Sequence, residues 1–360
     1  MGSKRSALKQ AGPATMRDVA RQAGVSVTTV SKVLNHIPYV SKVTQRRVEE
    51  AITALGFQPN ASAQQLQGGA SRIIALDLRQ TAQIDPLDRQ IDQLMDSSFL
   101  FKLLGGIGRV IAAAGYNLLW SMPASLPPDE HARAVARLYQ TGRADGIIVV
   151  GLSAADPRLT ALRACGCPYV VIGNPGDESL SVDSDNIAAG ALVARAFLDR
   201  GHRILAIAGG GTMMHMRDRL AGYQGVIAAA GATLLPEPDC VGESSFDRGR
   251  RQVRCLMALP TPPTAVFACS NLVGLGVLAE AQALGVGIPE QLAVVAFDDE
   301  PTCEMSTPPL SSVAQDVAGL GQQATRMLLA ELVGEAIPSR RILLPTDLVE
   351  RLSLGELRHD

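Results

Sequence analysis

The stretch that decides the fold of the amino-terminal part reads TMRDVARQAGVSVTTVSKVLN, from Thr15 to Asn35. Thr15 can cap a first helix because its side-chain oxygen can accept from free backbone amides, and apolar residues then recur at helical spacing. Gly24 follows where the chain must take a positive φ to leave that helix. Ser26 can cap a second helix that runs from Val27 to about Asn35. Two short helices joined by a glycine turn are typical of a helix-turn-helix.

A third helix is expected from Thr44 to Leu55, with Thr44 as its cap. Its apolar residues fall on one side, so three short helices can share one small core. The residues expected to face that core are Met16, Val19, Ala20, Ala23, Val30, Val33, Leu34, Val48, Ala51, Ile52 and Leu55. We therefore expect a small all-α domain over residues 14–58, preceded by a flexible basic tail over residues 1–13.

The charge of the chain is unevenly distributed. Residues 1–72 hold ten Lys and Arg against three Asp and Glu, a net charge of +7. The remaining residues hold 23 basic and 32 acidic side chains, a net charge of −9, so the −2 of the whole chain is a cancellation. A basic module before an acidic body indicates a polyanion as the partner of the first part.

The second helix would expose Val27, Thr28, Ser31 and Lys32 on its outer side. An ordinary solvated helix face is the alternative for such a set. The positive charge and the hydroxyl groups near the helix starts favour nucleic acid, because backbone amides and short hydroxyls bind phosphates while side chains reach base edges. The hydroxyl groups in question belong to Thr15, Ser26, Thr29 and Thr44.

From residue 73 onward, short apolar runs alternate with helical patterns. The runs typical of strands are Ile73–Leu78, Tyr116–Trp120, Gly146–Val150, Tyr169–Ile172, Ile204–Ala208, Ala265–Ala268 and Leu292–Phe297. The helical patterns between them include Leu103–Ala114, His131–Gln140, Ala188–Arg200, Asp218–Ala230, Asp247–Met257 and Val273–Leu284. This alternation predicts an α/β fold with two doubly wound parallel sheets, each covered by helices on both faces. A small ligand would bind in a cleft at the carboxyl ends of the strands.

Composition and motifs exclude several classes of protein. Hydrophobic residues make up 47% and charged residues 19%, which is incompatible with disorder and sufficient for a core. The first 15 residues lack the apolar centre of a secretory signal, so we expect a cytoplasmic protein. Motifs for phosphate loops, dinucleotides, nucleophile elbows and zinc proteases are absent, so we expect no enzyme, no cofactor and no metal. Six cysteines suggest reduced thiols, with a weak redox or metal pair at Cys165 and Cys167 as the alternative.

Two runs carry a family resemblance: TMRDVARQAGVSVTTVSKVLN, and YVSKVTQRRVEEAITALGFQPNASAQQL from Tyr39 to Leu66. They resemble the headpiece and hinge of the lac repressor (LacI/GalR) family of bacterial transcription regulators. The resemblance implies that the exposed side of the second helix faces the major groove. Lys32 stands where the family often has arginine, and a lysine loses the bidentate contact to guanine. The resemblance extends the set of DNA-binding residues to Asn35, Tyr39, Asn60, Ala63 and Leu66.

Residues 59–70 correspond to the hinge helix and linker of that family. Asn60 can cap a helix there, but so short a helix is not stable alone in water. In the family this hinge folds on operator DNA, where paired hinge helices enter the minor groove and a leucine separates a base step. Leu66 occupies that position, with a linker residue that contacts its own domain as the alternative.

The body, residues 71–360, resembles the effector-binding and dimerisation core of the same family. The runs that carry the resemblance are VDSDNIAAGALVARAFLDRGHRILAIAGG, RLAGY, GIPEQLAVVAFDD, PPLSSVAQDVAGLGQQA and LLPTDLVER. They imply a periplasmic-binding-protein-like fold of two subdomains, about 71–180 with 316–345 and about 181–315 with 346–360. The implied crossovers between the subdomains lie near 175–182, 312–317 and 343–346.

Arg219, in the RLAG motif, matches the family arginine that contacts the effector. A guanidinium in a cleft can bind sugar hydroxyls, a carboxylate or a phosphate, and a surface salt bridge at a helix start is the alternative. Asp298 matches the ligand-binding acid of the family. Ser270 and Asn271 stand where the family usually has Asn-Asp, which weakens any inference of a sugar. The further expected effector-binding residues are Asn174 and Phe99.

The stretch 79–98 is longer than the corresponding loop of the family. In the family this loop supplies part of the ligand pocket and part of the dimer face. Because the loop differs here, the resemblance does not identify the effector. We expect a DNA-binding regulator, usually a repressor, that binds a palindromic operator as a homodimer and responds allosterically to a small molecule, for example a sugar or sugar derivative. No leucine heptad follows Leu354, so no added tetramer helix is expected. A small-molecule receptor and a sugar or nucleotide transferase are the alternatives.

Overall fold

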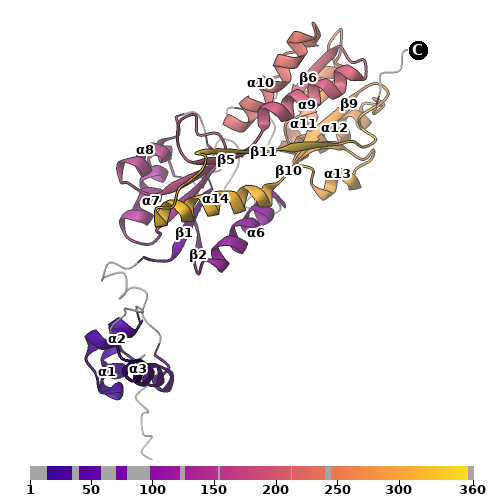
Figure 1. Cartoon of the computed structure of the whole chain (residues 1–360). Coiled ribbons are helices and arrows are strands. Elements are labelled where there is room, and N and C mark those ends of the chain that lie inside the picture. The colour runs from indigo at the N-terminus through magenta and orange to yellow at the C-terminus, as the bar shows by residue number, and fades with distance from the viewer. Residues whose placement is uncertain are drawn as a thin grey trace, which may run out of the picture. The chain divides into compact units, whose positions relative to one another are not determined.

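The chain was studied as a computed structural model, which describes residues 14–34, 40–57, 70–78, 98–121, 126–152, 155–211, 213–239 and 245–355. It divides into two compact units, Met1–Ser71 and Arg72–Asp360, and each is described by itself (Figure 1). In the described part of the chain, no helix is long and apolar enough to cross a membrane.

The first unit consists of α1 (Met16–Ala23), α2 (Val27–Leu34) and α3 (Lys42–Leu55). Gly24 ends α1 with a φ of 63°, as the turn between two helices requires. The three helices bury one apolar cluster, whose fully or nearly fully enclosed residues are Val19, Ala20, Ala23, Val30, Val33, Val48, Ala51 and Phe57. The expected three-helix architecture is therefore confirmed.

The start of α3 differs from the expectation. The helix begins at Lys42, and its cap is Ser41, whose extended backbone lets Oγ accept from the Thr44 amide at 3.2 Å. Thr44 lies inside the first turn, and its hydroxyl is 2.9 Å from the Ser41 hydroxyl. The prediction that Thr44 caps the helix was wrong because an equally good capping residue stands three positions earlier.

The second unit contains two six-stranded sheets. The first, in spatial order, is β11 (Arg341–Leu344), β5 (Ser181–Ser184), β4 (Tyr169–Ile172), β3 (Gly146–Val150), β1 (Ile73–Leu78) and β2 (Asn117–Ser121). The second is β12 (Thr346–Val349), β10 (Ser311–Gln315), β9 (Ala293–Phe297), β8 (Ala265–Ala268), β6 (Ile204–Ala208) and β7 (Thr233–Leu234). Among the described strands, only β12 pairs antiparallel, with β10.

Helices cover both faces of each sheet. One face of the first sheet is covered by α6 (Ser98–Ala113) and α14 (Val317–Val333). The other face is covered by α7 (Pro128–Gln140) and α8 (Pro157–Ala164). The second sheet lies between α9 (Asn186–Asp199) with α10 (Met214–Ala229) and α11 (Ser245–Met257) with α12 (Asn271–Ala283), and the short α13 (Pro301–Met305) follows β9. Alternate strand residues serve the two faces: Ile148 packs towards α6 and α14, and Ile147 towards α7 and α8.

The chain passes between the two sheets three times. β5 belongs to the first sheet, where Val182 pairs with Ile172, so the first crossing comes at Asp185. The second falls at Asp316, between β10 and α14, and the third at Pro345, between β11 and β12. The last two lie within the expected ranges, whereas the first is later than the expected 175–182. The expected end of the first subdomain near 180 therefore moves to Ser184, because β5 completes that sheet.

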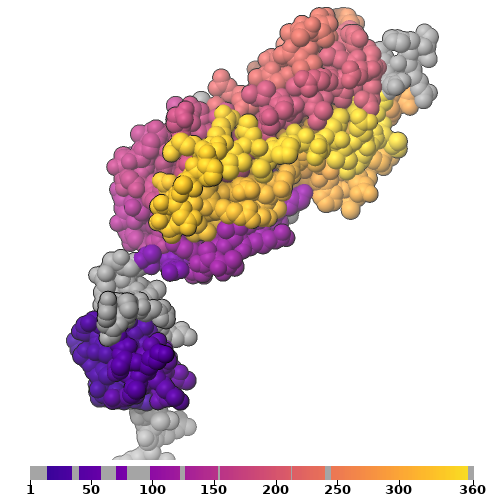
Figure 2. Space-filling view, viewed as in Figure 1, coloured from indigo at the N-terminus to yellow at the C-terminus, as the bar shows by residue number. Residues whose placement is uncertain are grey.

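The crossings are joined directly to the helices that follow them. Asp185 accepts from the Ala188 amide at 2.9 Å and caps α9, and Asp316 accepts from the Gly319 amide at 2.7 Å and caps α14. Figure 2 shows the carboxy-terminal part of the chain, in yellow, running along one face of the second unit across both halves. The three connections lie side by side, because β5 pairs with β11 and β10 pairs with β12.

Candidate functional site

The first candidate surface is the outer side of α2. Val27 is 40% exposed, and Thr28 and Lys32 are exposed as well, whereas Val30 and Val33 on the opposite side are buried. Ser31 lies on the same outer side as Lys32 and is partly buried. One short helix thus presents a lysine, two hydroxyls and a small apolar side chain together, a set able to hydrogen-bond base edges and contact a thymine methyl.

The hydroxyls at the helix starts are engaged in capping. The Thr15 Oγ1 atom accepts a hydrogen bond from the Asp18 amide at 3.3 Å. The same hydroxyl donates to the Asp18 carboxylate at 2.6 Å. The Thr15 hydroxyl and the Thr15 backbone amide, which both donate to this carboxylate, lower the pKa of Asp18. Ser26 accepts from the Thr29 amide at 3.1 Å, and the two hydroxyls are 2.8 Å apart. The caps fix where α1 and α2 begin, and free backbone amides at helix starts are groups that bind phosphates.

Five of the expected DNA-binding residues lie outside the described residues. They are Asn35, Tyr39, Asn60, Ala63 and Leu66. One residue that the sequence did not single out, Arg47 of α3, donates through Nη2 to the Ala23 carbonyl at 2.5 Å. It therefore closes the carboxyl end of α1 and holds α3 against the helix-turn-helix.

The second candidate site centres on Arg219 in α10. Its side chain is buried, with Nε donating to Asn186 Oδ1 at 2.9 Å and Nη1 donating to the Cys269 carbonyl at 2.7 Å. The guanidinium carbon lies 3.3 Å from the centre of the Phe297 ring. Burial lowers the pKa of Arg219, and the negative charges of neighbouring acids partly offset this decrease. This geometry excludes the alternative of a surface salt bridge.

Asp298 lies at the carboxyl end of β9, directly after Phe297. Gln315 Nε2 donates to Asp298 Oδ1 at 2.7 Å, and the Ser184 hydroxyl donates to Gln315 Oε1 at 2.7 Å. Ser184 and Gln315 are the last residues of β5 and β10, immediately before two of the crossings. Asp298 is partly exposed, yet protein surrounds it closely, and this desolvation raises its pKa. A carboxylate beside Arg219 is thus hydrogen-bonded to the connections between the halves.

Asp183 is a buried acid that the sequence did not indicate. Its Oδ1 accepts from the Ser184 amide at 2.8 Å and from Asn186 Nδ2 at 3.1 Å, while Oδ2 has no hydrogen-bond partner among the described residues. Asn186 therefore joins Asp183 to Arg219. Burial raises the pKa of Asp183 to about 6. The only sequence signal for Asp183 was its position two residues before Asp185, which caps α9.

Contacts between the two halves of the second unit flank this group. Asn174, which follows β4, donates through Nδ2 to Asp218 Oδ2 of α10 at 2.8 Å. The Met214 amide at the start of α10 donates to the Leu152 carbonyl, after β3, at 3.3 Å. The first turns of α10, which carry Arg219, therefore touch both halves. Asn174 thus joins the end of β4 to the helix that carries Arg219.

A buried ionic cluster supports the part of the first half that α10 touches. Arg158 Nη1 donates to Asp77 Oδ2 at 2.8 Å and to the Val150 carbonyl at 3.1 Å, and Nε donates to Asp156 at 3.0 Å. His131 Nε2 lies 2.8 Å from the other Asp77 oxygen. Each of these side chains is almost fully buried. The cluster fixes the carboxyl end of β3 and hence the backbone next to Leu152.

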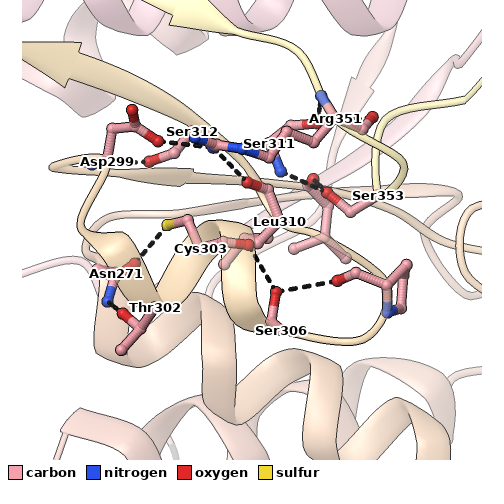
Figure 3. A network of polar contacts seen from close by, with 12 residues as sticks. Asn271, Asp299, Thr302, Cys303, Ser306, Leu310, Ser311, Ser312, Arg351 and Ser353 are labelled. Atoms are coloured by element: carbon pink, nitrogen blue, oxygen red, sulfur yellow. Dashed lines mark hydrogen bonds and ion pairs between the residues drawn. The ribbon is translucent and has the colours of Figure 1, made fainter.

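The expected effector residues Ser270 and Asn271 are used within their own half. Ser270 caps α12 by accepting from the Val273 amide at 3.4 Å. Asn271 donates to the Thr302 hydroxyl at 2.7 Å and accepts from the Cys303 thiol at 2.5 Å (Figure 3). Its backbone hydrogen-bonds Asp298. The backbone of Asn271 therefore supports Asp298. The side chain of Asn271 contacts Thr302 and Cys303 of α13.

Figure 3 also shows how the turn after Asp298 is held. Arg351 Nη1 donates to Asp299 Oδ1 at 2.6 Å and to the Leu310 carbonyl at 2.8 Å. The Asp299 amide donates to the Ser312 hydroxyl at 3.1 Å. The hydrogen bond and charge of Asp299 raise the pKa of Arg351. The segment after β12 thus fixes the turn that carries the candidate ligand-binding acid.

Phe99 in α6 packs, partly buried, against the apolar core of the first half. Within the described residues, no group of three His, Cys, Asp or Glu side chains could hold a metal ion. The thiols of Cys165 and Cys167 each donate to a nearby backbone carbonyl, at 3.3 Å in both cases. Burial raises the pKa of Cys167 to about 12, so this thiol stays protonated and unreactive.

Comparison with known proteins agrees with this architecture. The family model of the bacterial regulatory proteins of the lacI family matches residues 15–60, and that of the periplasmic binding protein-like domain matches residues 194–354. The HTH-type transcriptional regulator CelR of Thermobifida fusca is 32% identical over 345 residues, which are 94% of this chain and 98% of CelR. The HTH-type transcriptional repressor CytR of Escherichia coli (strain K12) is 30% identical over 356 residues, 98% of this chain and 99% of CytR.

Solved structures agree as well. A crystal structure of the lac repressor dimer bound to operator and the anti-inducer ONPF superposes with a TM-score of 0.78 at 25% identity, covering 95% of this chain and 99% of that one. A complex of the regulator CelR with cellobiose superposes with a TM-score of 0.68 at 29% identity, covering 94% and 99%. Since these regulators match the chain from the helix-turn-helix through both sheets, the protein belongs to the lacI family of bacterial regulatory proteins.

Proposed function

We propose that this protein is a cytoplasmic transcriptional repressor that binds a palindromic operator as a homodimer and changes its operator affinity when a small molecule binds between the two sheets of its second unit. The observation that carries the proposal is the presence, in one chain, of an exposed helix-turn-helix surface and of Arg219 and Asp298 beside the crossings. Each protomer would read one half-site with α2.

The DNA side of the proposal depends on Val27, Thr28, Ser31 and Lys32. These side chains share the outer side of α2, and a lysine there reads guanine less strictly than an arginine would. Bound half-sites selected from random duplexes by the full chain should be palindromic, and DNase footprints should cover two half-sites. Thr28→Ala should change the preferred sequence. Thr53→Ala is the matched control, because the Thr53 hydroxyl bonds to its own helix at the Glu49 carbonyl, 3.0 Å away.

The hinge part of the proposal concerns Leu66. A leucine that separates a base step acts only when the hinge is bound specifically, so Leu66→Ala should weaken operator binding more than binding to unrelated DNA. Equal losses on both DNAs, measured at the same salt concentration, would contradict a wedge.

The effector side depends on coupling between two sites. A ligand that prefers one arrangement of the two halves must change operator affinity by the same factor by which operator changes ligand affinity. Arg219→Gln should remove the response of the operator complex to the effector in a gel-shift titration while operator binding itself persists. Loss of operator binding in the same variant would show instead that Arg219 serves only the fold.

A further inference from the structure

Arg219 by itself does not define the charge of the effector. A buried guanidinium can bind hydroxyls of an uncharged molecule as well as a carboxylate or a phosphate. The charges that surround Arg219 distinguish these ligands, because a buried anion is stable only where opposite charge compensates it.

Among the described residues whose charges act on Arg219 and Asp183, carboxylates outnumber cations. Asp298 and Asp183 both act on the charge of Arg219, and Asp218 acts in turn on Asp183. The other cation that acts on Asp183 is Arg341, which is exposed to solvent and therefore screened. Arg219 is thus already compensated by two acids before any ligand binds.

His215 does not supply the missing positive charge. It lies on α10, four residues before Arg219 and on the same side of the helix. Burial and the charge of Arg219 lower the pKa of His215 to about 3, so the imidazole is neutral at physiological pH. Glu300, in contrast, adds a further negative charge near Asp298.

Asp183 gives an independent indication of the missing group. Its Oδ2 is buried and has no hydrogen-bond partner among the described residues, although Oδ1 has two. A buried carboxylate oxygen without a donor is unusual in proteins and indicates a partner that is absent from the chain itself. Such an oxygen needs a hydrogen-bond donor, whereas the oxygens of an anionic group are acceptors.

We infer that the effector carries no negative charge and offers hydrogen-bond donors, and that Asp183 and Asp298 exclude phosphorylated and carboxylated analogues of it. This inference rests on the proposed function, since it assumes that the effector binds beside Arg219. Asp183 is then the residue that determines the charge of the ligand, while Arg219 and Asp298 orient it.

The first experiment does not require the effector to be known. Sulfate and inorganic phosphate are titrated into the full chain and into Arg219→Gln, and the thermal midpoints are compared at constant ionic strength. In the wild type neither anion should give a stabilisation that depends on Arg219. In Asp183→Asn, where one compensating charge is gone, an Arg219-dependent stabilisation should appear. A wild-type site that binds sulfate through Arg219 would overturn the inference.

The second experiment uses matched ligands. Hexoses, disaccharides and nucleosides are each titrated next to their phosphate ester, and the sugars also next to their uronic acid, by calorimetry with the full chain. Binding should be confined to uncharged or cationic members, with the anionic partner at least about tenfold weaker. Asp183→Asn should reduce this ratio. Asp199→Asn, which removes an exposed acid at the end of α9, should leave it unchanged.

Measurements of operator binding distinguish a failure of the inferred ligand charge, called the charge rule below, from a failure of the proposed function. An anionic ligand that releases operator would refute the charge rule and leave the proposed function intact. An uncharged ligand that binds beside Arg219 without changing operator affinity would support the charge rule and refute the allosteric function. Should Asp183→Asn fail to fold, Asp218→Asn removes a neighbouring negative charge on α10 and tests the same ratio.

Discussion

Arg351 Nη1 lies 2.6 Å from Asp299 Oδ1, and this ion pair joins the segment after β12 to the turn that carries Asp298. Asp298 and Asp299 both have positive φ, 89° and 45°, which non-glycine residues adopt only when neighbours hold them there. The pair therefore holds a strained turn whose first residue is the candidate ligand-binding acid.

Replacing Arg351 should consequently affect ligand binding through Asp298. Arg351→Gln removes a charge and a donor to the Leu310 carbonyl, and we expect the free energy of unfolding to fall by about 1–3 kcal/mol. Effector affinity should fall as well, and Arg351→Lys should restore stability more than affinity because the ammonium keeps the charge without the fixed, planar donor geometry of the guanidinium. Urea unfolding and calorimetry measure the two effects. Lost stability with unchanged affinity would show that the turn does not position Asp298.

Asp183 should make stability depend on pH. Its pKa is about 6 in the folded chain against an ordinary value of 3.8, so the folded state holds the proton more tightly between these values. The contribution of Asp183 is thus fully present below pH 4 and is lost as the pH rises to 6, by about 3 kcal/mol in total. The difference in unfolding free energy between the wild type and Asp183→Asn, measured in urea from pH 4 to pH 7, should fall in this window. A difference independent of pH would show that Asp183 is not desolvated.

Much of the second unit is predictable from its sequence, and the exceptions have a common cause. The strands Gly146–Val150 and Ala265–Ala268 were expected with the observed bounds because each is a wholly buried apolar run. In contrast β5 reads Ser-Val-Asp-Ser, and a strand of polar residues has no hydrophobic pattern to detect. Its residues are buried because β5 lies between β11 and β4 in the first sheet. For this reason the first crossing was expected too early and Asp183 was overlooked.

The starts of helices were also expected too late. α10 was expected from Asp218 and begins at Met214, and α12 was expected from Val273 and begins at Asn271. First turns contain capping and polar residues, so the apolar repeat becomes visible only one turn later. The site is affected directly, since the first turn of α10 holds Met214, whose amide donates to the Leu152 carbonyl, and His215, which lies one turn before Arg219. The RLAG resemblance found Arg219, but its partners Asn186, Cys269 and Phe297 come from the start of α9, the end of β8 and β9, and could not be predicted from spacing.

The close approach of α9 and α10 should be sensitive to one methyl group. A Cβ at Gly190 would overlap the Arg219 carbonyl oxygen, whereas a Cβ at Gly225, on the outer side of α10, would meet nothing within 4 Å. Gly190→Ala should destabilise the second unit by about 1–3 kcal/mol and weaken effector binding, because it pushes away the helix turn that carries Arg219. Gly225→Ala should be neutral or stabilising by up to about 1 kcal/mol. Thermal unfolding and effector titration of both variants give the comparison, and equal effects would show that the helix spacing is not critical.

The bond from Asn174 Nδ2 to Asp218 Oδ2 should favour the arrangement in which the two halves touch. Asn174→Ala removes it at a partly buried position, which corresponds to about 0.5–1.5 kcal/mol. If the effector binds the closed arrangement, its affinity should fall by about two- to tenfold, since the equilibrium between open and closed halves shifts before binding. The free energy of unfolding should fall by no more than this amount, because both halves keep their cores. Small-angle scattering of the wild type and the variant, with and without a bound effector, checks closure directly. Equal scattering and equal affinity would show that this bond follows closure and does not favour it.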